Sequence, residues 1–72
     1  MTTQKLGKTL KKRRESLNIT VYRMMKESKL GLVTVKRIEE GNDAYTFKSL
    51  LAYCKVLGLE IEFVEINYNK NK

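Results

Sequence analysis

The sequence predicts a small, mainly α-helical domain of four short helices followed by one β-strand. Apolar residues recur at three- and four-residue spacing through most of the chain, and capping residues divide that pattern into four segments. The spacing changes to two in LEIEFVEINY, which is rich in β-branched and aromatic residues. The chain has 72 residues, no proline and no internal repeat. We therefore expect one continuous domain with a small core.

The first helix is expected from about residue 3 to residue 17. Its apolar stripe is formed by Leu6, Leu10 and Leu17. The opposite face is basic and carries Lys5, Lys8, Lys12 and Arg13. Asn18 tolerates left-handed backbone and is placed to end the helix.

A second helix is expected over residues 21–28, and a third follows over residues 32–40 after a turn of Lys29 and Leu30. Thr20 and Gly31 are placed to cap the starts of these helices, and Gly41 the end of the second. Ile19 and Met24 can form a hydrophobic staple. Val35 and Ile38 are spaced to face inward.

The fourth helix is expected over residues 47–57, with Thr46 as its N-cap and a second staple between Tyr45 and Leu50. Its apolar positions have helical spacing and should face inward: Phe47, Leu50, Leu51, Cys54 and Leu57. Cys54 is either a small core residue or a reactive thiol, and the former is favoured. A single cysteine also indicates a reducing compartment, so a cytoplasmic location is expected.

After Gly58 the alternating pattern predicts a strand from residue 59 to about residue 67. Its two faces both carry apolar side chains: Leu59, Ile61 and Phe63 on one, and Val64, Ile66 and Tyr68 on the other. A lone strand has no partner in its own chain, so the natural partner is the same strand of a second copy. The expected organisation is a body of residues 1–58, a dimerisation strand of residues 59–68 and a frayed tail of residues 69–72.

The net charge is +7 and is unevenly distributed. Residues 1–58 hold thirteen Lys and Arg against five Asp and Glu, whereas residues 59–72 hold two against three. A basic body suits DNA or an anionic membrane surface, although charge of this kind also serves solubility alone. No apolar run approaches the ~18 residues of a membrane span, and no signal-peptide core follows the first lysines.

Enzymatic chemistry is not predicted. The chain has no histidine, which excludes a His-based triad, and it lacks the Cys and carboxylate spacings of a zinc site. Glu60 and Glu62 share a strand face, but solvated positions are favoured over an acid–base pair. We expect no metal, no cofactor and no small-molecule substrate.

The segment Ile19 to Gly41, ITVYRMMKESKLGLVTVKRIEEG, resembles without gaps the helix-turn-helix of the Xre family, the Cro and phage-repressor type. The matching positions are Ile19, Thr20, Met24, Met25, Val35, Ile38, Glu39 and Gly41, and the resemblance extends upstream to Arg14 and downstream through Phe47, Leu50 and Leu57 to Leu59. The segment LGLEIEFVEI looks like that of HipB-type antitoxins, in which a C-terminal strand pairs between subunits. The resemblance implies a lambda-repressor-like four-helix DNA-binding domain with one intersubunit strand.

In such a motif the second helix of the pair, here residues 32–40, enters the major groove while the first crosses the backbone. The resemblance therefore places Leu32, Val33, Lys36 and Arg37 at base edges, with a structural ion pair between Arg14 and Glu39. Lys36 and Arg37 could donate to guanine, whereas Leu32 and Val33 could contact a thymine methyl or instead pack on the second helix or at an interface. Phosphate contacts are expected from Thr20, Val21, Tyr22, Arg23, Lys29, Thr34, Asn42, Tyr45 and Lys48. Most of the cluster of residues 11–14 should simply be solvated, Arg14 excepted.

Several positions depart from the family pattern. Lys29 stands where Gly is favoured in the turn, Val21 where Gln is common, Leu32 and Val33 where polar residues are usual, and Asp43 and Tyr45 replace a frequent cation and proline. The leading functional prediction is a sequence-specific DNA-binding transcriptional regulator, a homodimeric repressor that inserts helix 32–40 into the major groove. The alternative is an antitoxin-like or accessory protein whose main partner is another protein, such as a toxin, with autoregulatory DNA binding. A membrane-surface peptide or a small enzyme has little support.

Overall fold

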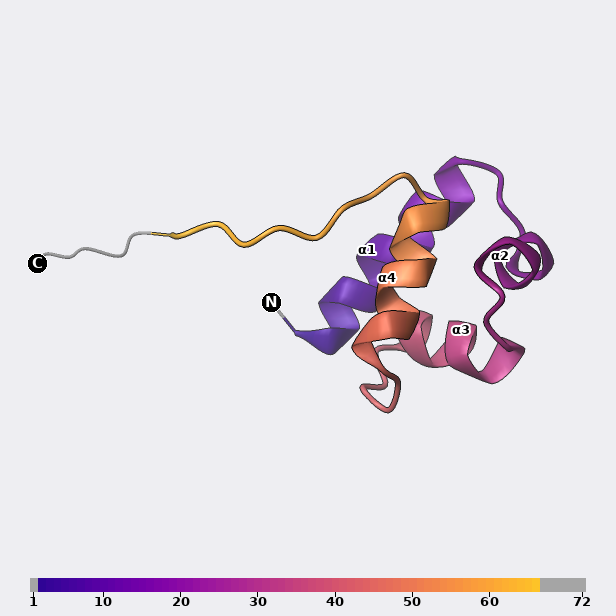
Figure 1. Cartoon of the computed structure of the whole chain (residues 1–72), viewed down its shortest axis with the longest axis horizontal. Coiled ribbons are helices and arrows are strands. Elements are labelled where there is room, and N and C mark those ends of the chain that lie inside the picture. Colours follow the sequence, from indigo (N-terminus) through magenta and orange to yellow (C-terminus); the bar gives the residue numbers. More distant parts are fainter. Residues whose placement is uncertain (1, 67–72) are drawn as a thin grey trace, which may run out of the picture.

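The computed structural model describes residues 2–66 and has the predicted mainly helical fold (Figure 1). Its four helices are α1 (Thr3–Ser16), α2 (Val21–Ser28), α3 (Leu32–Glu40) and α4 (Phe47–Val56). α3 packs against all three other helices, and α2 also packs against α4. Among these residues, no helix is both long enough and apolar enough to cross a membrane.

The predicted helix ends are confirmed to within one residue. α2 and α3 have the predicted bounds, whereas α1 and α4 each end one residue earlier than expected. The hydroxyls of Thr20 and Thr46 cap α2 and α4 by accepting from the amides of Arg23 at 3.0 Å and Ser49 at 3.1 Å. Thr2 caps α1 in the same way, which was not predicted. Capping hydroxyls therefore set where three of the four helices begin.

The core lies between the four helices and is formed by Leu10, Ile19, Met24, Val35, Ile38, Leu50, Tyr53, Cys54 and Leu57. Both members of the first predicted staple, Ile19 and Met24, are buried in it. Cys54 is 5% exposed, and its burial raises the pKa of the thiol. A raised thiol pKa disfavours the reactive thiolate, so Cys54 acts as a core residue, as favoured from the sequence.

Three predicted inward positions are wrong. Phe47 and Leu51 are 59% and 42% exposed, because α2 and α3, which pack on α4, cover only the side centred on Leu50, Tyr53 and Leu57. Leu17 is 40% exposed, since it is the C-cap of α1 and lies beyond the last helical turn. A small domain covers a narrower arc of each helix than the apolar spacing implied.

The segment after α4 begins with a hydrogen-bonded C-terminal cap. Gly58 has a φ of 71° and donates its amide to the carbonyl of Lys55 at 3.1 Å, while the amide of Leu59 donates to the carbonyl of Cys54 at 2.9 Å. These two bonds form a Schellman motif. Residues 59–66 then run away from the helices (Figure 1), and no strand occurs within residues 2–66 of the single chain. The intersubunit strand stays a prediction, and its end at residues 67–68, like the predicted frayed tail at 69–72, lies outside the described residues.

Candidate nucleic-acid interface

α2 and α3 are joined by a short turn whose geometry is held by local bonds. Lys29 has a φ of 64°, a left-handed conformation that glycine adopts without strain, and donates its amide to the carbonyl of Met25 at 2.9 Å. The hydroxyl of Ser28 bonds to the carbonyl of Met24 at 2.6 Å and accepts from the amide of Leu30 at 3.2 Å. Leu30 also packs against the core. The turn therefore sets a defined angle between the two helices.

The outer face of α3 carries the four residues predicted to meet DNA bases. Val35 and Ile38 are buried on its inner face. Leu32 and Val33 are 44% and 61% exposed, and Lys36 and Arg37 are exposed as well. The sequence left open that Leu32 and Val33 pack on the second helix, but α2 does not cover them in the single chain. An exposed helix face with two cations and two apolar side chains remains.

The starts of α2 and α3 are both electrostatically positive. Neither first turn contains an acidic residue. Gly31, the N-cap of α3, makes no side-chain capping bond, so the first amides of α3 have no protein side chain as an acceptor. Free amides and the positive end of the helix dipole together favour an anion such as a backbone phosphate.

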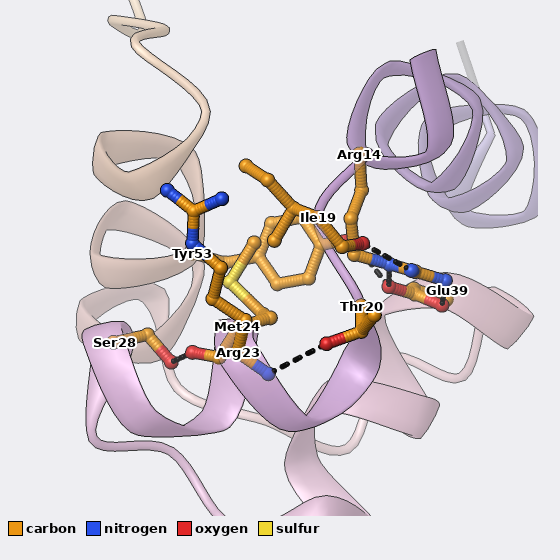
Figure 2. A network of polar contacts seen from close by, with 8 residues as sticks. All are labelled: Arg14, Ile19, Thr20, Arg23, Met24, Ser28, Glu39 and Tyr53. Carbon is orange, nitrogen blue, oxygen red and sulfur yellow. Dashed lines mark hydrogen bonds and ion pairs between the residues drawn. The ribbon is translucent and has the colours of Figure 1, made fainter. Parts of the chain in front are cut away.

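A buried polar network holds the C-terminal end of α3 (Figure 2). Arg14 of α1 donates through Nε and Nη2 to the two carboxylate oxygens of Glu39, at 2.7 and 3.2 Å, and through Nη1 to the carbonyl of Ile19, at 2.7 Å. The two side chains of the pair are each 7% exposed. The predicted ion pair is therefore present, and hydrogen bonds to Glu39 raise the pKa of Arg14.

Tyr53 of α4 is a third member of this network, which sequence reasoning missed. Its ring is fully buried, and its hydroxyl donates to Oε2 of Glu39 at 2.5 Å. Desolvation, followed by the bond to Glu39, raises the pKa of Tyr53 well above its usual value. Its spacing in the sequence could have indicated this burial, because Tyr53 lies three residues after Leu50 and four before Leu57, on the inward face of the helix. Glu39 thus links α3 to both α1 and α4.

Close backbone contact between α1 and the end of α3 completes this support. A Cβ at Gly7 would lie 2.5 Å from the carbonyl oxygen of Ile38, and one at Gly41 would lie 2.5 Å from Cα of Gln4. Gly41 also has a φ of 84°. Glycine is required at both positions, because any side chain would force α1 away from α3.

The predicted phosphate contacts fall into two groups. Tyr22 is exposed at the start of α2 and Lys48 at the start of α4, whereas Thr20 is exposed but its hydroxyl already accepts from the Arg23 amide. Others are engaged within the protein: Arg23 pairs with Glu27 at 2.6 Å, Asn42 accepts from the Ala44 amide at 2.8 Å, and Val21 and Tyr45 pack partly against the core. Thr34 is half-buried. Burial raises the pKa of Tyr45, so its hydroxyl stays neutral.

Two cations lie differently from what the sequence suggested. Lys29 lines an open groove with Lys55 and Val56, between the ends of α2 and α4. Lys11, expected to be merely solvated, lines a groove of about 140 Å³ together with Val21, Lys36, Glu40 and the Arg14–Glu39 pair. Lys11 therefore joins the cations beside the start of α2.

Arg37 donates to the carbonyl of Ala44 at 3.2 Å, which ties it to the loop after α3.

Comparison with known proteins adds no family to this description. Neither a scan against protein-family models nor a search of curated proteins finds a match to the chain.

Proposed function

We propose that this protein is a sequence-specific, homodimeric DNA-binding regulator of transcription that acts as a cytoplasmic repressor. The observation that carries the proposal is the exposed start of α3: uncapped amides, Lys36 and Arg37 on the same helix, and apolar Leu32 and Val33 between them and the turn. A helix of this kind fits the major groove of B-DNA with its first residues at base edges.

The support for α3 is consistent with that role. Glu39 is held by Arg14 and Tyr53, and Gly7 brings α1 against the end of the same helix. The C-terminal end is thus fixed, while Leu32, Val33 and Lys36 on the outer face stay exposed. A recognition helix requires this arrangement, because a base-edge hydrogen bond is lost when its donor moves by about an ångström.

Pairing of residues 59–66 with the same segment of a second copy is part of the proposal. The alternating apolar pattern and the segment's direction away from the helices support it. Each subunit would then place its α3 in one half-site, and the two half-sites would lie about one helical turn apart. The single buried cysteine, a free thiol, supports a reducing cytoplasmic compartment.

The test is fluorescence anisotropy on a palindromic duplex selected from random DNA, with a scrambled duplex for comparison. Lys36→Ala should lower affinity for the selected duplex more than for the scrambled one, whereas Lys8→Ala, an exposed lysine on α1, should have little effect on either. Steep salt dependence with equal affinity for all duplexes would show only non-specific binding and would reject the proposal.

A second candidate is favoured by one specific observation. Leu32 and Val33 are 44% and 61% exposed where polar side chains are more useful for reading bases. An apolar, exposed helix start of this kind also suits a protein partner, as in an antitoxin or accessory factor that binds DNA for autoregulation. Co-purification of a partner that is lost in Leu32→Ser, with DNA binding unchanged, would favour this candidate.

A further inference from the structure

The outer side of α4 carries an exposed strip that the proposed DNA contacts leave unused, apart from Lys48 at its edge. It consists of Phe47, Lys48, Leu51 and Lys55, which we name the α4 strip. Phe47 and Leu51 are 59% and 42% exposed, and both lysines are exposed. At about 100° per residue the four positions fall within roughly 100° of arc, so they form one continuous surface. The surface is apolar along one edge and basic along the other.

The C-terminal segment, residues 59–66, has the complementary composition. Phe63, Val64 and Ile66 are 95%, 69% and 84% exposed, and no cation lies among these eight residues. Glu60, Glu62 and Glu65 are interspersed among the apolar side chains. An apolar and acidic segment thus faces solvent on a chain whose α4 strip is apolar and basic.

The segment does not fold back along α4 of its own chain. The Schellman motif turns the chain at Gly58, and the half-buried Leu59 packs against the core directly after it. Figure 1 shows the following residues running outward from the end of α4. Eight extended residues span about 26 Å, whereas the ten residues of α4 span about 15 Å. The segment is therefore long enough to reach along α4 of another molecule.

Strand pairing alone would leave the two segments weakly held. An isolated two-stranded ribbon is marginally stable in water unless a helix or further strands cover its apolar face. We propose that the α4 strip docks the C-terminal segment of a second copy of this chain, and that by two-fold symmetry each copy covers the strip of the other. This inference rests on the dimer of the proposed function and adds the surface that the dimer requires.

Sedimentation of the full chain tests the contact. Leu51→Ser should raise the dimer dissociation constant about tenfold or more, since both symmetric sites are lost, whereas Leu32→Ser, at 44% exposure on α3, should leave it unchanged. Lys48→Glu with Lys55→Glu should weaken the dimer as well. Adding Glu60→Lys and Glu62→Lys, which share one face of the extended segment with Val64 and Ile66, should restore the dimer. A variant that merely misfolds would not be restored in this way.

Paramagnetic relaxation enhancement identifies the occupant. In a Cys54→Ala background, a chain spin-labelled through Glu65→Cys is mixed with an isotope-labelled chain that lacks the spin label. Broadening of amides 47–55 in the isotope-labelled copy is the expected result. Broadening only when both labels are on one chain would mean that the segment folds back on its own α4, and would overturn the inference.

The outcomes separate this inference from the dimer itself. A full chain that stays monomeric at every concentration would overturn both. A dimer that responds equally to Leu51→Ser and Leu32→Ser would overturn the α4 contact and leave the strand-paired dimer standing. Either result is independent of whether the protein binds DNA, which anisotropy measures separately.

Discussion

Replacing Arg14 with methionine tests the anchor of α3. Methionine keeps much of the side-chain length but removes three hydrogen bonds, two to the Glu39 carboxylate and one to the carbonyl of Ile19. Glu39 would retain only the hydroxyl of Tyr53 as a partner while its side chain stays 7% exposed. Removing one member of a buried pair costs on the order of 3–5 kcal/mol, because the remaining charge is left without its counterion.

That loss is large compared with the whole stability of the domain. A chain of 72 residues has a free energy of unfolding of about 4–11 kcal/mol at 0.05–0.15 kcal/mol per residue. At 4–8 °C for each kcal/mol, a loss of 3 kcal/mol lowers the thermal midpoint by at least about 12 °C. Arg14→Met should therefore be largely unfolded well below the midpoint of the wild-type protein.

The assay is thermal and urea unfolding followed by circular dichroism, with Lys12→Met as the matched control. Lys12 lies on the same helix and is exposed, and its replacement removes the same charge. We expect its midpoint to change by only a degree or two, because exposed charges contribute little. Equal midpoints for Arg14→Met and Lys12→Met would refute the buried anchor.

Three further predictions concern positions around this anchor and the turn. The pKa of Tyr53 is raised in the folded state, so this group should leave the free energy of unfolding unchanged below the unfolded value near pH 10 and lower it as the pH rises further. Tyr53→Phe in a Cys54→Ala background should make that alkaline loss smaller in melts between about pH 9 and 11.5, with the raised pKa of Tyr45 contributing the remainder, and an unchanged slope would argue against it. Lys29→Gly should raise the free energy of unfolding in urea by up to about 1 kcal/mol, since glycine adopts the observed left-handed conformation without strain, and a loss of stability would mean that strain at this site is negligible. Gly7→Ala should lower the free energy of unfolding by about 1–3 kcal/mol, because its Cβ would press on the α3 backbone. A Cβ at Gly31 would have nothing within 4 Å, so Gly31→Ala should not meet a clash. Equal urea midpoints for the two variants would contradict the close approach of Gly7 to α3.

Helix bounds were predictable because local chemistry determines them. Thr20, Thr46 and the left-handed residue at position 41 act within one turn of chain, so the sequence is sufficient to locate them. The Arg14–Glu39 pair followed from a family resemblance, not from spacing, because residues 25 apart meet only through tertiary packing.

The features that were missed depend on how helices are oriented. Tyr53 was overlooked because the buried side of α4 was assigned from its most apolar residues, which included the exposed Phe47 and Leu51. Gly7 lacks a side chain, so no apolar or polar pattern marks its contact with α3. Lys11 lies in the groove beside the start of α2 because of how α1 packs, which the spacing of residues along α1 does not reveal.

Amide chemical-shift mapping on the selected operator tests the central claim most directly. The full, isotope-labelled chain is titrated with the duplex, and shift changes are followed residue by residue. We expect the largest changes at residues 20–23 and 31–37, with little change at the exposed lysines Lys5, Lys8 and Lys12 of α1. Changes concentrated on that face of α1, with residues 31–37 unaffected, would contradict recognition by α3.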